Sequence, residues 1–237
     1  MKQKFEKKHI FFMALVVCAI IIIVAGSIFK KSRATVNEEA TAVITEETQG
    51  SGVNDTPIPE PIQVMSVDGQ GIYMTEVSVR MYQLRDYYTG LYGESPWATQ
   101  LEDGRTVSET AKDELYQSLI RTQILCNKAA EYDLGLSETE LQTCAEEAQR
   151  YIDELGPQIC QNFNVTFDGA MTVNQKQLLA AKVYEQVMSE LGTDTNSSEQ
   201  TGEEKFLKYE ELYQQWLKDC TITEMPAWQN VVIGSVG

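Results

Sequence analysis

The chain has 237 residues, enough for one or two domains, a net charge of −16 and a single histidine, His9. The first 33 residues contain seven lysines or arginines and one glutamate, so the remaining residues carry a charge of −22. A body this acidic repels phosphate backbones, and a body without histidine cannot form imidazole metal sites or Cys/His and Ser/His catalytic pairs. We therefore predict no nucleic-acid binding, no catalytic residue, no metal and no cofactor.

The chain begins with a basic segment, residues 1–9, followed by an uncharged apolar run over residues 10–29. The run has about the length of a helix that crosses a bilayer. We predict that Ile10 to Phe29 is a transmembrane signal anchor in the cell membrane, with residues 1–9 in the cytoplasm and the body on the extracytoplasmic side. Basic residues flank both ends, so they orient the segment only weakly. The alternative is a signal peptide cleaved near Ala25-Gly-Ser27, which would give a secreted protein.

Residues 30–63 are rich in Thr, Glu, Gly, Ser and Pro and have no apolar period. Such a segment cannot bury enough apolar surface to fold, so we predict a disordered acidic tether. Residues 64–237 are predicted to form one mainly α-helical domain. It begins at Val64 with a short strand, a turn at Asp68-Gly69 and a second extended piece that ends at Met74.

Apolar residues three or four positions apart predict the helices of this domain. They cover residues 75–91, 108–132, 137–155, 173–191 and 203–218. Gly135 suits the turn between the second and third helices, which we expect to pack as an antiparallel hairpin. Ser137 and Glu140 form a capping box at the start of the third helix, and Gly156-Pro157 ends it.

The last predicted element is a strand over residues 220–224, which is β-branched and alternating. We expect it to pair with the strand near Val64–Val67 and so to bring the two ends of the body together.

Four cysteines lie outside the apolar run. Cys126 and Cys144 each lie nine residues from Gly135, so an antiparallel hairpin would place them at the same level. We hypothesise a disulfide bridge or a core contact between them, with Cys160 and Cys220 as the remaining pair. Four free thiols are an equal alternative, because free cysteine packs as a small apolar residue.

The candidate client-binding residues are the aromatic side chains Tyr87, Tyr88, Tyr92 and Trp97. Tyrosine and tryptophan combine a large contact area with a polar group, which suits adaptable binding. The alternative is that they belong to the core, as residues at helical spacing usually do. Tyr87 and Tyr92 lie off the main apolar stripe of their helix, so we expect these two to be exposed.

Short motifs follow one another in a recognisable order over about residues 64–232. They are Val67-Asp-Gly69, Tyr92-Gly93, Trp97, Asp103-Gly104, the helix end Ala129 to Leu136, the box Ser137 to Glu140, Leu179 to Glu185, and Tyr213-Gln-Gln-Trp216 before the last strand. This order resembles the N-terminal chaperone domain of SurA/PrsA-type extracytoplasmic foldases. The resemblance implies a SurA-N-like helical chaperone domain, built from both ends of the body, that binds unfolded or partly folded exported polypeptides.

Many members of that family carry a parvulin prolyl-isomerase domain inserted before the last helix. Here only residues 192–202 occupy that position, too few for a domain. We therefore predict a non-catalytic chaperone whose acidic surface favours basic or apolar clients. The alternatives are a peptidyl-prolyl isomerase-related foldase with cryptic activity, and a dedicated module that binds a single partner in the envelope.

Overall fold

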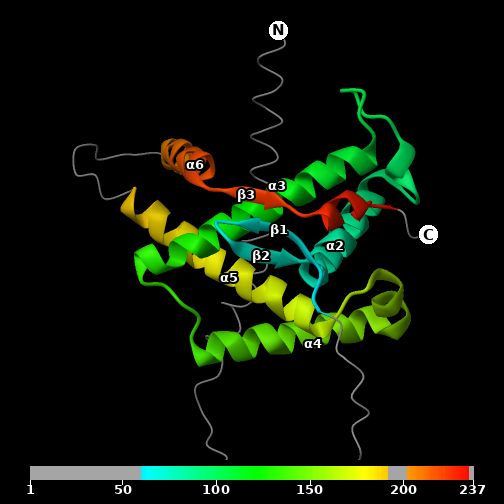
Figure 1. Cartoon of the computed structure of the whole chain (residues 1–237), viewed down its shortest axis with the longest axis horizontal. Helices are drawn as coiled ribbons and strands as arrows, with labels where there is room; N and C mark the ends of the chain where they lie inside the picture. The colour runs from blue at the N-terminus through cyan, green and yellow to red at the C-terminus, as the bar shows by residue number, and fades with distance from the viewer. Residues whose placement is uncertain (1–59, 192–201, 235–237) are drawn as a thin grey trace, which may run out of the picture.

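The computed structural model describes residues 60–191 and 202–234, which are mainly helical, with α5 (Phe167–Glu190) at the centre (Figure 1). Four helices pack against it: α2 (Met74–Tyr92), α3 (Val107–Lys128), α4 (Glu138–Phe163) and α6 (Gly202–Asp219). The buried side chains of α5 include Ala180, Ala181 and Val183, which are small enough to let neighbouring helices approach closely.

The three strands form one small antiparallel sheet in the order β2-β1-β3. They are β1 (Gln63–Val67), β2 (Gln70–Tyr73) and β3 (Ile222–Glu224). Asp68 and Gly69 join β1 to β2 with φ angles of 51° and 78°, the left-handed backbone that a two-residue hairpin turn needs. Met65 of β1 lies opposite Glu224 of β3, which confirms the predicted pairing of the two ends of the body.

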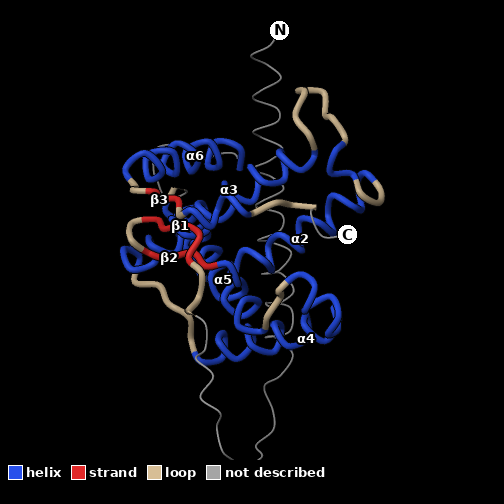
Figure 2. Tube along the Cα trace, turned by 45° about the vertical axis from the view of Figure 1, so that its right-hand side comes forward, coloured by secondary structure: helices blue, strands red, loops and turns tan. Residues whose placement is uncertain are grey.

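The predicted antiparallel hairpin of α3 and α4 is wrong. Both helices pack against α5, which lies between them in Figures 1 and 2. After α3 the chain forms the short helix η2 (Ala129–Tyr132) and then an extended linker, residues 134–137, that leads away from α3. Lys182 of α5 fastens this linker, because its ammonium donates to the Gly135 carbonyl at 2.7 Å and to Glu140 Oε1 at 2.9 Å.

The start of α4 is as predicted, with Ser137 and Glu140 forming a capping box. The predicted stop is also confirmed, since Gly156 has φ 74° and ψ 164° and interrupts the helix. The sequence did not indicate that a second helical part follows at once. Pro157 suits the first position of that part, which runs to Phe163.

Two apolar clusters make up the core. The larger lies between the sheet and the helices α3, α5 and α6, with Met65, Leu115 and Leu119 fully buried. The smaller joins α2 to α4 and the start of α5, around Tyr82 and Ala148. Two short helices complete the described chain: η1 (Pro96–Ala98), before α3, and η3 (Pro226–Asn230), after β3.

The predicted anchor, residues 10–29, the basic segment before it and most of the tether lie outside the described residues. Within residues 60–191 and 202–234, no helix has the length and apolar character that a membrane crossing needs.

Candidate functional site

Three large side chains are exposed together on the last turns of α2. Tyr87 is 38% exposed, Leu91 57% and Tyr92 50%. We call these three residues the α2 patch. The exposure of Tyr87 and Tyr92 is as expected from their place beside the apolar stripe. Leu91 belongs to that stripe by spacing, but it lies in the last turn of the helix, beyond the point where α2 is covered.

Tyr88 supports the patch from beneath and is not part of the surface, so its prediction as a client-binding side chain is wrong. Only 4% of it is exposed, and it belongs to the larger core cluster. Its ring stacks on Tyr92 with 6.0 Å between centroids and meets the edge of Tyr87 at 5.4 Å. These contacts hold the two exposed rings in fixed positions, which lowers the entropy lost when they bind.

Tyr88 is anchored in turn to α3 through a hydrogen bond between its hydroxyl and the Glu114 carboxylate. Burial raises the pKa of the Tyr88 phenol far above its ordinary value, and the bond to Glu114 adds to the rise. Burial also raises the pKa of the Glu114 carboxyl, although the bond from Tyr88 opposes it. Tyr88, which supports the α2 patch, therefore contacts a carboxyl group, that of Glu114, that is partly shielded from water.

Trp97 lies in η1, which contacts α2, but its indole is half-buried. Gly234 lies against it so closely that a Cβ at Gly234 would be 2.1 Å from Trp97 Cγ. Ser108 Oγ donates to the Ile233 carbonyl at 2.7 Å and holds this end of the chain on α3. Trp97 is thus covered by the C-terminal segment and offers less surface than Tyr87 or Tyr92.

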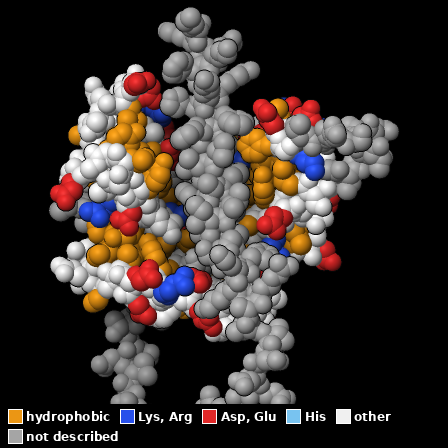
Figure 3. Space-filling view, turned by 180° about the vertical axis from the view of Figure 1, so that it is seen from behind, with side chains coloured by type: hydrophobic (Ala, Val, Ile, Leu, Met, Phe, Trp, Pro, Cys, Tyr) orange, Lys and Arg blue, Asp and Glu red, His pale blue; other side chains and the backbone are white. Residues whose placement is uncertain are grey.

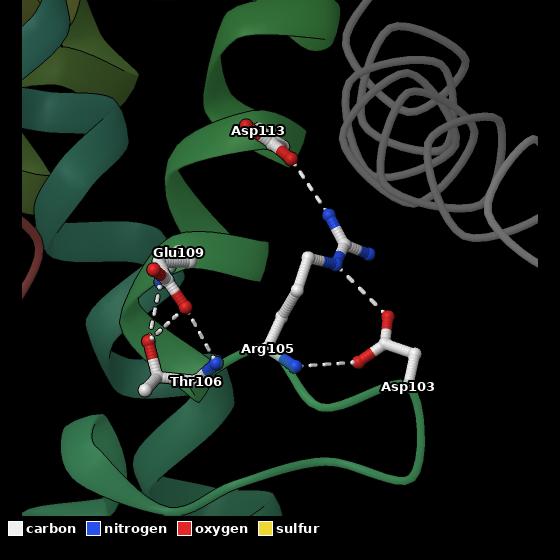
Figure 4. A network of polar contacts seen from close by, with 5 residues as sticks. All are labelled: Asp103, Arg105, Thr106, Glu109 and Asp113. Atoms are coloured by element: carbon white, nitrogen blue, oxygen red, sulfur yellow. Dashed lines mark hydrogen bonds and ion pairs between the residues drawn. The ribbon is translucent and has the colours of Figure 1, made fainter.

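A polar network orders the loop between η1 and α3 (Figure 4). The Arg105 guanidinium pairs with Asp103 at 2.9 Å and with Asp113 at 2.7 Å. Thr106 and Glu109 form the capping box that begins α3. The backbone and side chain of Arg105 lower the pKa of Asp103 by hydrogen bonding to its carboxylate. These exposed contacts fix how the loop after η1 joins the start of α3.

Cys126 and Cys144 are not joined, and the four described cysteines are free. The bridge was a consequence of the predicted hairpin, and α5 separates the two residues. The Cys126 thiol donates to the Lys176 carbonyl of α5, while Asn174 of α5 donates to the Cys144 carbonyl. Burial raises the pKa of the Cys126 thiol to about 12, so it is protonated and unreactive at neutral pH.

Sequence reasoning missed a buried ionic cluster between α2, α3 and α5. Glu76 is 2% exposed and pairs with Lys176 at 2.6 Å, and Arg80, one turn further along α2, is 8% exposed. Arg80 reaches Thr122 Oγ1 at 3.5 Å, and none of the described groups accepts a hydrogen bond from its Nε. Burial lowers the pKa of Arg80, while Glu76 opposes this. The signal was the pair of opposite charges four residues apart within the apolar stretch around Val77 and Val79.

The described residues contain no group of three Cys, Asp or Glu side chains placed to hold a metal. Two exposed aromatic rings and one exposed apolar side chain lie at the end of α2.

No protein-family model matches the chain, and no match was found among curated proteins or solved structures. The resemblance to the SurA/PrsA-type foldases therefore rests on the sequence motifs.

Proposed function

We propose that this protein is a membrane-anchored, extracytoplasmic, chaperone-like protein that binds unfolded or partly folded exported polypeptides without catalysis. The observation that carries the proposal is the α2 patch, in which Tyr87, Leu91 and Tyr92 are exposed side by side over the buried Tyr88. Contiguous exposed apolar side chains mark interaction sites. The proposal includes a single-pass anchor at Ile10 to Phe29 and a SurA-N-like domain.

The size of the patch suits transient binding. Covering its exposed fractions removes on the order of 300 Å² of mainly apolar surface, or ~7 kcal/mol at ~25 cal/mol per Å². Association costs from about 4 to 15 kcal/mol in lost freedom, so the patch alone gives weak and reversible binding. A holding chaperone needs that property, because its clients must leave to fold.

The acidic surface suits the same role. In the parts of the face in Figure 3 that the described residues make up, acidic, basic and uncharged polar groups lie among the apolar side chains. A strong negative charge keeps a protein and its bound client soluble, and it attracts basic segments.

The test is suppression of aggregation by the full chain in lipid nanodiscs, measured by light scattering while a chemically denatured protein is diluted. We expect suppression that saturates with added chain. Tyr87→Gln/Leu91→Gln should weaken it at least threefold. The matched control is Leu141→Gln/Leu207→Gln, which removes helical side chains that are 37% and 52% exposed elsewhere, and it should behave as the wild type.

Two results would contradict the proposal. Suppression that both double variants lose equally would mean that the effect is not local to the α2 patch. No suppression at any ratio, together with capture of one stoichiometric envelope partner, would favour a dedicated single-partner module. A proline-peptide isomerisation assay tests the cryptic isomerase alternative, for which we expect no rate above background.

A further inference from the structure

A cleft of about 610 Å³ lies where the ends of α3 and α6 meet the turn between β1 and β2. It is separate from the α2 patch, since the residues around it come from other elements. The lining residues include Asp68 in the turn, Gln123 and Lys128 in the last turns of α3, Glu131 in η2, and Trp216 and Asp219 at the end of α6.

The charge of this lining is negative. Three carboxylates, those of Asp68, Glu131 and Asp219, face one ammonium, that of Lys128. The last turns of two helices, α3 and α6, also border the cleft, and the carboxyl end of a helix carries a partial negative charge. Side chains and backbone therefore favour the same kind of occupant, a cation.

Trp216 gives the cleft a flat aromatic wall. The Lys128 ammonium already lies over its ring, 5.6 Å from the centroid, and is held there by an ion pair with Glu131 at 2.5 Å. The indole is half-buried, so one part is fixed by the core and another faces the cleft. A cation over an indole gains about 0.5–2 kcal/mol, more as water is excluded.

One acceptor in the wall has no partner. Gln123 is 6% exposed, and none of the described groups donates a hydrogen bond to its Oε1. Its orientation is fixed by its neighbours: the Asn127 amide donates to the Val67 carbonyl at 3.2 Å, so Asn127 Oδ1 accepts from Gln123 Nε2 at 2.8 Å. A buried acceptor left open in this way costs free energy unless a donor is supplied. Because this oxygen is itself buried, a donor in the cleft reaches it only if the Gln123 side chain turns toward the cleft.

We infer that this cleft binds an arginine side chain of a bound polypeptide, with the guanidinium replacing the Lys128 ammonium over Trp216 and on Glu131 and pairing also with Asp219. A guanidinium is planar, stacks on aromatic faces and has five N–H donors, whereas an ammonium is a compact, strongly hydrated charge. The volume admits the side chain with its adjoining backbone. This inference rests on the proposed function, because it names the feature of a client that the body recognises.

The experiment measures binding of two short, unstructured, fluorescently labelled peptides to the full chain in nanodiscs. The peptides are identical except that one carries arginine and the other citrulline, which has the same shape without the charge. We expect the arginine peptide to bind at least tenfold more tightly. Glu131→Gln/Asp219→Asn should remove most of that difference, because both carboxylates are exposed and their loss leaves the core intact.

The control variant is Glu102→Gln/Glu185→Gln, which changes the net charge equally at exposed positions that do not line the cleft. It should change the arginine preference less than twofold. An equal loss in both double variants would overturn the inference, since the preference would then come from the overall charge of the body. Equal binding of the two peptides by the wild type would overturn it as well.

The two proposals fail in different ways. If aggregation suppression depends on the α2 patch but the arginine preference is absent, the cleft inference alone is wrong. If the arginine preference maps to the cleft but aggregation is never suppressed, the proposed chaperone function is wrong and the cleft is the recognition site of a dedicated partner.

Discussion

Substitutions in the buried cluster of Glu76, Arg80 and Lys176 should lower the free energy of unfolding by unequal amounts. Glu76 is the carboxylate that compensates both cations, since it pairs with Lys176 at 2.6 Å and acts on Arg80 across one helical turn. Removing one member of a buried ionic group leaves the others without compensation, which is strongly destabilising. The cost therefore depends on what each substitution leaves behind.

Glu76→Gln leaves Arg80, 8% exposed, beside Lys176 with no countercharge from α2. We expect the free energy of unfolding to fall by about 4 kcal/mol, the usual cost of an uncompensated buried charge. Lys176→Met leaves Glu76 still compensated by Arg80, and the Lys176 side chain is already 19% exposed, so we expect a loss of only about 1–2 kcal/mol. The double variant Glu76→Gln/Arg80→Met should recover at least half of the larger loss.

The assay is urea unfolding of the full chain in a non-ionic detergent, followed by tryptophan fluorescence and circular dichroism, with all variants at one pH and ionic strength. Unchanged slopes against urea would show that the same surface unfolds in each variant. The reasoning is refuted if Lys176→Met costs as much as Glu76→Gln, or if adding Arg80→Met lowers the stability further. Either result would mean that Arg80 is not the group that needs Glu76.

Three further outcomes are expected. The pKa of Glu114 is raised in the folded protein, so the folded state binds this proton more readily than the unfolded state does. The free energy of unfolding should therefore fall as the pH rises above 4.5, the ordinary pKa of the group. Glu114→Gln should flatten this part of the curve of unfolding free energy against pH. Gly234→Ala places a Cβ against Trp97 at a φ of +89°, and it should cost about 2 kcal/mol and shift tryptophan emission to the red as the C-terminal segment lifts. Alkylation of the denatured, unreduced chain should modify both Cys126 and Cys144, and mass spectrometry that finds either protected would restore the disulfide.

The elements of the fold were predictable because their signals are local. Asp68 and Gly69 are residue types that readily adopt the left-handed backbone of a two-residue hairpin turn. The capping box that begins with Ser137 marks the start of α4. The early part of α5 was missed because its buried positions include Gly169 and Ala170, which are too small to show an apolar period. A Cβ at Gly169 would lie 2.5 Å from the Thr75 carbonyl oxygen, so the close approach to α2 explains the small residue.

The arrangement of the helices was harder to predict than their existence. An apolar stripe indicates that one face of a helix is buried, but it does not indicate which other helix covers that face. The α3–α4 hairpin was expected from chain order, yet Lys182 and the extended linker at Gly135 carry α4 to the other side of α5. The hypothesis of a Cys126–Cys144 bridge was wrong for the same reason.

The candidate site was predictable in part. Tyr87 and Tyr92 lie beside the stripe and are exposed, whereas Tyr88 lies on it and is buried. The cleft could not be predicted, because it joins side chains from three distant segments, as Asp68, Gln123 and Trp216 illustrate. No local pattern brings these residues together.

The antiparallel pairing of β1 with β3 also sets the order of events during synthesis. Met65 leaves the ribosome well before its partner Glu224, with about 160 residues between them. At a synthesis rate of roughly 5–20 residues per second, β3 is made about 10–30 s after β1. During that time the edge of β1 that pairs with β3 has no partner strand. Helices α2 to α5 are complete within that time, but the sheet cannot close. A chain truncated before Ile222 would keep that edge open permanently and would be prone to strand-mediated self-association.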